Sequence, residues 1–178
     1  MNQDNNNEKN AVAKSFLAAM SSSEFWEVVQ KCKRFDDPAD GQENKLAKLQ
    51  PQQVAAFKWH LENFVCAAYS WDMWGAAYML RSGCSEDSFM NFLYGLVSQG
   101  KRRYEKAVHN PDSLAELWGQ PDISSEDYCY VPRRVYAEMT GQEIPDNCWI
   151  VPGTLTGEYF SDTPIDAMCD ELLARTQF

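Results

Sequence analysis

Three acidic side chains near the middle of the chain could do chemistry together: Asp72, Glu86 and Asp87. Asp72 stands between two tryptophans, and the other two follow a Gly-Cys pair that predicts a tight turn. Carboxylates that meet at such a corner could bind a hard cation or act as general acid and base. Each could instead occupy the first turn of its own helix, where the helix dipole stabilises negative charge. Because the spacing matches no known metal-binding loop, the second interpretation is favoured.

A second candidate is Cys84, which follows a glycine and precedes a serine that is expected to begin a helix. The positive end of a helix can lower the pKa of a thiol and so favour the nucleophilic thiolate. A cysteine nucleophile normally needs a histidine partner, and the chain has only His60 and His109. Since nothing in the sequence ties either histidine to Cys84, a small core residue is the favoured interpretation.

Three aromatic residues, Trp71, Trp74 and Tyr78, recur at helical spacing and could line a pocket for a small ligand. Such a stripe is more often one face of a core helix, so we expect these side chains to be mostly buried and structural. No catalytic residue, metal ligand or cofactor is predicted. The candidate binding residues are Trp71, Asp72, Trp74, Tyr78, Cys84, Glu86 and Asp87.

Signatures of several enzyme classes are missing from the sequence. Two histidines and six scattered cysteines, none in a C-x-x-C pair, form no zinc ligand pattern. Phosphate-loop, dinucleotide-binding and G-x-S-x-G motifs do not occur. The basic run 101–106 could hold a phosphate group, but cationic residues at the end of a helix are the ordinary explanation. The cysteines are predicted to be free thiols.

Helices must position these residues, because apolar side chains recur at spacings of three, four and seven and no convincing strand alternation appears. The sequence therefore predicts a compact all-α domain of six to eight helices. The predicted helices span residues 24–34, 42–49, 51–69, 71–81, 85–100, 112–118, 124–140 and 164–175, and the helix from Ser85 either ends at Gly100 or continues through Lys106. Serines at 22 or 23, 85 and 124 are the expected N-caps, and Asp-Pro and Asp-Gly pairs predict a loop over 35–41.

Three parts of the chain differ in composition. Residues 1–22 are polar and predicted to be a mostly disordered tail. Residues 23–146 form the predicted helical domain. Residues 147–178 are an acidic extension, rich in proline and glycine, with a final helix.

The middle of the chain resembles a known family. The segments 71–78, Trp-Asp-Met-Trp-Gly-Ala-Ala-Tyr, and 83–87, Gly-Cys-Ser-Glu-Asp, are similar to the core motif of a bacterial domain-of-unknown-function family, the one numbered 4240. Ser98-Gln-Gly100 belongs to the same motif, and further similarity extends the resemblance over about residues 23–146. The resemblance implies a bacterial protein and no particular activity.

Three positions depart from that family. It usually has a glycine where Ser88 stands, and it tends to carry an arginine and a tryptophan in the helix where this chain has Leu93 and Gly95. A function that needs this arginine is therefore not expected here.

Charge is distributed unevenly along the chain, whose net charge is −10. Residues 1–106 contain 13 acidic and 13 basic side chains, whereas residues 107–178 contain 13 acidic side chains and only Arg133, Arg134 and Arg175. Such an acidic half repels nucleic acids and membrane surfaces and speeds encounter with a basic protein. Solubility alone is the plainer explanation of the same charge.

These features favour a non-enzymatic protein that binds another protein, with a basic partner expected. An immunity- or regulator-like role, in which an acidic surface covers a basic one, is the sharpest form of this hypothesis. The alternatives are a metal-dependent hydrolase that uses the clustered carboxylates and a small-molecule sensor that uses the aromatic cluster. Neither a signal peptide nor a long apolar segment is recognisable, so a cytoplasmic location is expected.

Overall fold

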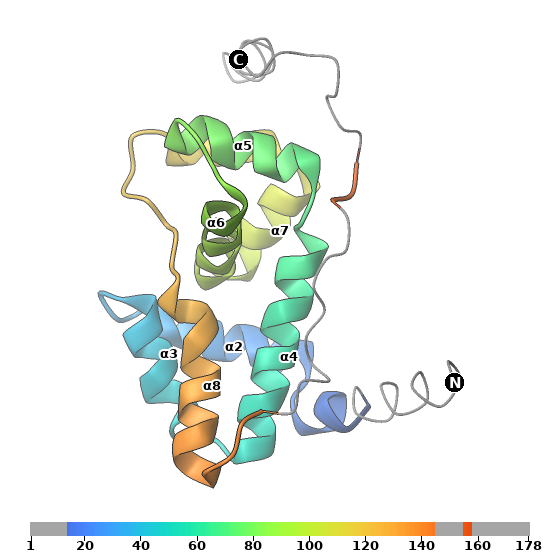
Figure 1. Ribbon diagram of the computed structural model, residues 1–178, viewed down its shortest axis with the longest axis vertical. Coiled ribbons are helices and arrows are strands. Elements are labelled where there is room, and N and C mark those ends of the chain that lie inside the picture. The colour runs from blue at the N-terminus through green and yellow to red at the C-terminus, as the bar shows by residue number, and fades with distance from the viewer. Residues whose placement is uncertain (1–13, 145–154, 158–178) are drawn as a thin grey trace.

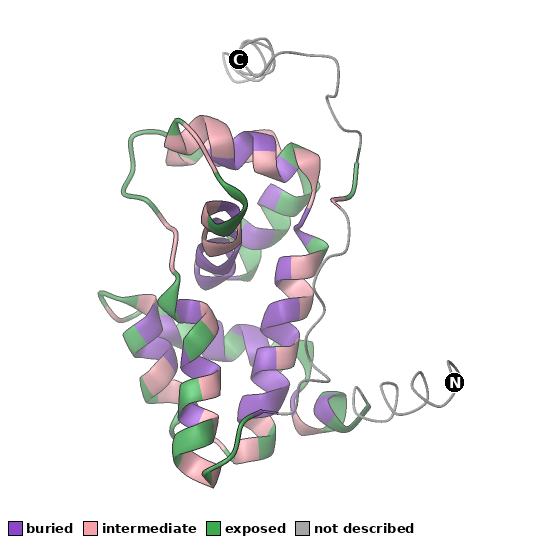
Figure 2. Cartoon of the chain, in the orientation of Figure 1, coloured by how far each residue is buried: buried purple, intermediate pink, exposed green. Residues whose placement is uncertain are grey.

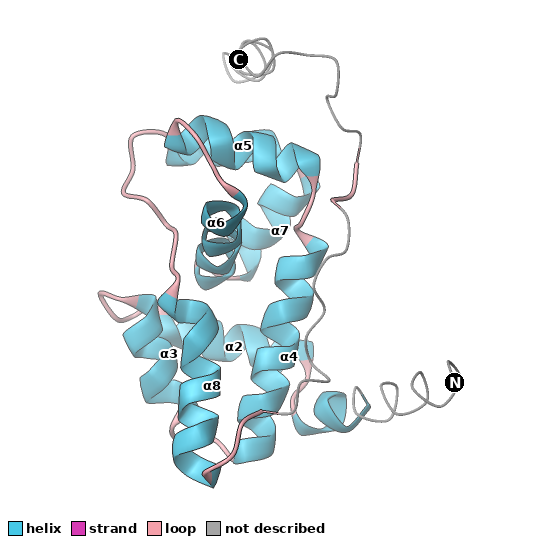
Figure 3. Cartoon of the chain, viewed as in Figure 1, coloured by secondary structure: helices cyan, strands magenta, loops and turns pink. Residues whose placement is uncertain are grey.

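The computed structural model describes residues 14–144 and 155–157, and these residues are helical with no β-strand (Figures 1 and 3). The predicted all-α fold class is confirmed. A short helical segment at 14–19 comes first. The elements that follow are α2 (Ser22–Cys32), α3 (Pro38–Leu46), α4 (Pro51–Ala67), α5 (Trp71–Arg81), α6 (Glu86–Ser98), α7 (Lys101–His109), the 3-10 helix η1 (Pro111–Leu117) and α8 (Asp127–Thr140). The predicted final helix, 164–175, lies outside the described residues.

The helices form two groups that share α4. In one group α8 packs against α3 and α4, and α2 packs against α3. In the other, η1 packs against α5 and α7, and α6 contacts α4, α5 and α7. Figure 1 shows α4 running along both groups, with α5, α6 and α7 at one end of the molecule. This helix therefore joins the two groups into one body.

A single hydrophobic core runs through both groups of helices (Figure 2). Its fully buried aromatic side chains come from α2, α4, α6 and α8. Burial of each such side chain contributes roughly 1.5–3 kcal/mol relative to exposure. These residues are Phe25, Phe57, Phe89, Phe92 and Tyr128.

Helices α4, α5 and α6 agree with the sequence-based predictions, and two other helices begin earlier than predicted. Helix α2 is capped by Ser21, not by Ser22 or Ser23, because Ser21 and Glu24 form a reciprocal capping box. The predicted loop over 35–41 is confirmed for 35–37 and wrong for 38–41, which belong to α3. Asp37 accepts a hydrogen bond from the backbone N–H of Ala39 at 2.8 Å, and Pro38 occupies the first position of α3, where a missing N–H costs nothing.

Helices α2 and α3 approach each other closely at Gly41. A Cβ atom added there would lie 2.5 Å from the carbonyl oxygen of Cys32. The Asp-Gly pair that predicted a turn is therefore part of a helix, and its glycine serves helix packing instead.

The described segment near the C-terminus lies against the junction of α4 and α5. The backbone N–H of Trp71 donates to the carbonyl of Thr156 at 3.0 Å, and the N–H of Thr156 donates to the carbonyl of Tyr69 at 3.3 Å. These bonds form an isolated parallel bridge. Residues 155–157 are thus attached to the helical domain at the start of the Trp71 motif.

Candidate functional site

The predicted aromatic cluster joins α5 to α6. The rings of Trp71 and Trp74 stack with centroids 5.6 Å apart, and Trp74 stacks on Phe89 at 5.2 Å. The indole N–H of Trp74 donates to the carbonyl oxygen of Cys84 at 2.9 Å. Trp71, Trp74 and Tyr78 are each half-buried, while the fully buried face of α5 presents Met73 and alanines. The stack therefore has a structural role at this corner of the fold.

The three predicted carboxylates lie exposed in the first turns of their helices. Asp72 is in the first turn of α5, and Glu86 and Asp87 are in the first turn of α6. Glu86 accepts a hydrogen bond from the hydroxyl of Tyr69 at 3.2 Å. Across the described residues, no group of three or more His, Cys, Asp or Glu side chains is arranged to hold a metal ion. The positions fit the helix-dipole interpretation.

Cys84 is half-buried, and burial raises the pKa of its thiol, with the nearby Arg81 opposing and Asp122 adding to the rise. This direction is opposite to the lowering that the alternative, a nucleophilic thiolate, requires. The sulfur of Cys84 contacts the carbonyl oxygen of Ser85 at 3.6 Å. His60 is buried with Nε2 2.8 Å from the carbonyl oxygen of Met20. The imidazole of His60 is thus engaged with the backbone at Met20, and the hydrogen bond of the Cys84 thiol goes to Ser85.

Four cysteines fall within the described residues, and all four are free thiols, as predicted: Cys32, Cys66, Cys84 and Cys129. Burial raises the pKa of Cys32 to about 12 and those of Cys66 and Cys129 to about 11. At neutral pH these groups are protonated and weakly nucleophilic.

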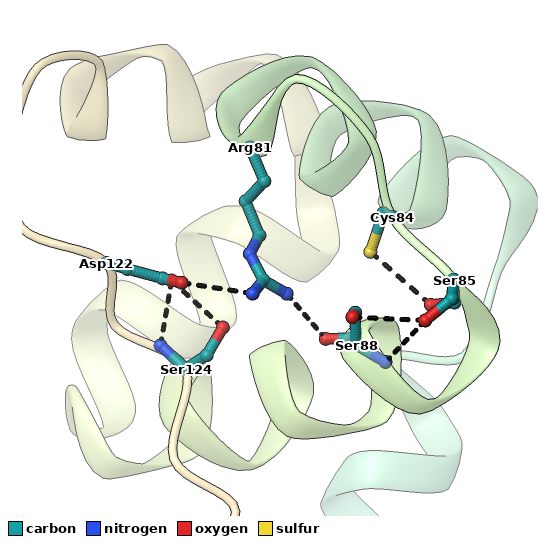
Figure 4. A network of polar contacts seen from close by, with 6 residues as sticks. All are labelled: Arg81, Cys84, Ser85, Ser88, Asp122 and Ser124. Carbon is teal, nitrogen blue, oxygen red and sulfur yellow. Dashed lines mark hydrogen bonds and ion pairs between the residues drawn. The ribbon is translucent and has the colours of Figure 1, made fainter.

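Figure 4 shows a polar network around Arg81 that the sequence did not indicate. The Arg81 guanidinium donates to the carbonyl oxygen of Ser88 at 2.9 Å and lies 3.1 Å from the carboxylate of Asp122. Asp122 also accepts hydrogen bonds from the N–H and hydroxyl of Ser124 at 3.0 and 2.9 Å. Burial tends to raise the pKa of Asp122, but these hydrogen bonds and Arg81 bring it below its ordinary value. The network ties α5, α6 and the loop 118–126 together.

The loop 118–126 lies directly on α6. The N–H of Ser125 donates to the carbonyl of Asn91 at 3.1 Å. A Cβ atom at Gly95 would lie only 1.8 Å from the carbonyl oxygen of Ile123. This contact accounts for glycine at a position where the resembled family tends to have tryptophan. Ser124, which was predicted to cap α8, instead binds Asp122 within the loop.

An open cavity of about 850 Å³ lies between this loop and the start of α3, and we call it the acidic groove. Asp122 is paired with Arg81, Glu116 is paired with Lys106, and Asp37 caps α3. The remaining three carboxylates make no ion pair with any described residue. The charged residues that line the acidic groove are Asp36, Asp37, Arg103, Glu116, Asp122, Glu126 and Asp127.

An exposed tryptophan stands beside the acidic groove. Trp118 is 60% exposed and lies in the chain between two groove-lining residues, Leu117 and Gln120. Tryptophan is enriched among the residues that anchor protein interfaces, so this position is a candidate contact for a partner.

Another residue that sequence reasoning missed is Glu62, which is 8% exposed on α4 and paired with Lys58. The sequence contained a pattern from which the burial of this residue could have been predicted. Lys58 and Glu62 are spaced by four residues and each directly follows an apolar residue of the core face, Phe57 and Leu61. A charged pair so close to a core face predicts a buried ion pair.

Comparisons with known proteins give one match. Residues 20–138 match a family described as Protein of unknown function (DUF4240), which confirms the resemblance seen in the sequence. No curated protein and no solved structure matches the chain. Within the described residues, no helix has the combination of length and apolar character that crossing a membrane requires.

Proposed function

Because the chain belongs to the DUF4240 family, whose function is unknown, we propose from the structure that it is a non-enzymatic binding protein. Its acidic groove binds a basic segment of another protein. An immunity- or regulator-like protein of this kind works by covering a basic surface of its partner, and it needs no catalytic group.

The observation that carries this proposal is the set of unpaired carboxylates in the acidic groove. Asp36, Glu126 and Asp127 are exposed, and none forms an ion pair with another described residue. They therefore offer charge that a lysine or arginine of a partner can satisfy. Facing acidic and basic surfaces steer the encounter and set the register of binding.

The exposed Trp118 supplies an apolar contact with the partner, which the carboxylates of the groove cannot provide. Interfaces draw most of their affinity from a few buried aromatic or arginine anchors, which charged rim residues surround. An exposed tryptophan beside free carboxylates matches that arrangement. The partner is accordingly expected to combine basic residues with an apolar pocket or patch.

The test is site-specific photo-crosslinking in cells that naturally contain the protein, with the photoreactive amino acid at Gln120 in the groove wall. The test variant carries three charge reversals: Asp36→Lys, Glu126→Lys and Asp127→Lys. The matched control reverses three exposed acids that do not line the groove, and so has the same net charge: Glu27→Lys, Glu138→Lys and Glu143→Lys.

The proposal predicts crosslinks to a basic protein in the wild type and the control, and their loss in the groove variant. Crosslinks of equal intensity in both triple variants would show that groove charge does not recruit the partner. A captured partner that is itself acidic would contradict the proposal as well.

A further inference from the structure

A second cavity, of about 810 Å³, lies where α4, α6 and the start of α8 meet, and we call it the Glu62 pocket. It shares Glu126 with the acidic groove, so the two cavities adjoin. The residues that line it are Glu62, Asp87, Met90, Asn91, Tyr94, Glu126, Cys129, Tyr130 and Arg133.

Glu62 is the unusual group in this pocket. Its side chain is 9% exposed and one carboxylate oxygen is paired with Lys58. The other oxygen, Oε2, is buried and has no hydrogen-bond partner among the described residues. A buried charged acceptor without a partner is costly, so a donor that enters the pocket gains more from it than from an exposed carboxylate.

The charge of the pocket favours a cation over an anion. Three of the lining side chains are carboxylates, and Arg133 is the basic one among them. Lys58 balances one of the carboxylates, which still leaves an excess of negative charge. The lining carboxylates do not form a group that could hold a metal ion. An organic cation therefore fits this pocket better than a bare metal ion.

The apolar part of the lining indicates what else such a ligand carries. Tyr94 is 7% exposed and Tyr130 is 53% exposed, so the lining includes one buried and one exposed aromatic side chain. Met90 adds a flexible apolar side chain. Aromatic faces attract cations, and the methylene groups of an alkyl stem gain from contact with this surface.

We propose that the Glu62 pocket binds the ammonium or guanidinium group of an organic cation that carries an alkyl stem, with Glu62 as its counter-ion. The cation can be a free amine or a lysine or arginine side chain of a bound protein. The pocket adjoins the acidic groove and shares Glu126 with it, but binding of a small organic cation does not require a protein partner. Burial raises the pKa of Glu62, and a bound cation would act on it in the opposite direction, as Lys58 already does.

The experiment is a titration followed by amide chemical shifts of the full chain, with four probes. n-Butylammonium and n-butylguanidinium represent free organic cations, N-acetyl-lysine amide represents a protein side chain, and n-butanol is the neutral control. We expect saturable binding of the cations with a Kd of about 1 mM or below, and no binding of butanol.

The chemical-shift changes should centre on the residues around Glu62 and Tyr94. Tighter binding of the lysine amide than of the butyl probes identifies a protein side chain as the source, and the reverse identifies a free amine.

Two variants distinguish a specific contribution of Glu62 to cation binding from the general attraction of a negatively charged protein. Glu62→Gln should weaken cation binding by at least about tenfold, because a charge-assisted hydrogen bond is lost. The control is Glu138→Gln, an exposed acid on α8 outside the pocket, which should leave binding unchanged. Equal loss in both variants, or no saturable binding of any cation to the wild type, would overturn the proposal.

A second variant keeps the test decisive if Glu62→Gln does not fold. Lys58→Met removes the internal partner of Glu62. A cation that takes its place should raise the melting temperature of Lys58→Met by more degrees than that of the wild type, because the ligand binds only the folded chain. Equal shifts in the two proteins would contradict the role of Glu62. All these probes are small molecules, so the result is independent of whether the acidic groove binds a protein.

Discussion

The guanidinium of Arg81, at the end of α5, lies 3.1 Å from the carboxylate of Asp122 in the loop 118–126. Because Asp122 lines the acidic groove, this ion pair connects the helical corner that the sequence motif builds to the surface that we propose for binding. Within the motif at 71–87, Arg81 thus helps to hold one wall of the groove.

Breaking this pair should loosen the loop more than it destabilises the fold. Arg81→Met removes the ion pair and the hydrogen bond to the Ser88 carbonyl, and we expect a loss of about 1–2 kcal/mol in the free energy of unfolding. Amide hydrogen exchange should quicken at Ser124 and Ser125 while α4 keeps its protection. Uniform exchange changes in both regions would contradict this local role.

The same pair predicts a pH dependence. The pKa of Asp122 in the folded protein lies below its ordinary value of 3.8, so its contribution to stability is complete above that value and is lost as the pH falls through the lower, folded-state pKa. Asp122→Asn should be less stable than the wild type near neutral pH, and the difference should shrink between about pH 4 and pH 2. A difference that is constant over this range would contradict the lowered pKa.

Two buried tyrosines should respond in opposite ways to loss of the hydroxyl. The hydroxyl of Tyr128 is buried and has no hydrogen-bond partner among the described residues, whereas that of Tyr104 donates to the carbonyl of Phe64 at 2.6 Å. Tyr104→Phe should therefore cost about 1 kcal/mol, and Tyr128→Phe should be neutral or stabilising by up to about 1 kcal/mol. Urea unfolding measures both. Equal costs would mean that the Tyr128 hydroxyl is satisfied in solution.

Trp74 should matter for stability and not for ligand binding. Trp74→Ala removes the stack on Phe89 and the hydrogen bond to Cys84, and should cost roughly 3 kcal/mol. Trp74→Phe keeps a ring in the stack and should cost about 1 kcal/mol. Thermal unfolding measures both variants. An unchanged melting temperature in Trp74→Ala, together with loss of a small ligand, would identify the aromatic cluster as a pocket.

The sequence was sufficient for the parts of the fold that local pattern determines. Apolar spacing and the Ser85 cap place α4, α5 and α6 where the structure has them. The start of helix α3 was placed four residues too late, because Asp-Pro is typical both of turns and of the first residues of a helix. Only the close packing of α3 against α2 at Gly41 shows that this segment is the start of a helix and not a turn.

The candidate sites were harder to predict, since they depend on contacts between distant segments. Arg81 meets Asp122 only because the loop crosses α6 at Gly95, and no local pattern reports that crossing. The sequence composition showed that residues 107–178 are acidic. It did not show that four of their carboxylates line one groove with Asp36 and Asp37 from the other half of the chain. For Glu62, by contrast, the four-residue spacing from Lys58 next to an apolar face was a usable signal.

The most direct test of the binding proposal is the association rate of the crosslinked partner as a function of salt. The Debye length falls from about 30 Å at about 0.01 M salt to about 8 Å at about 0.15 M. We predict that the on-rate drops at least about tenfold between these conditions while the off-rate changes little, and that Glu126→Lys reproduces part of this loss without changing stability. The acids Asp162 and Asp166, for which the sequence alone suggests the same effect, lie outside the described residues. An on-rate that is independent of salt, or full binding by the triple groove variant, would contradict the account.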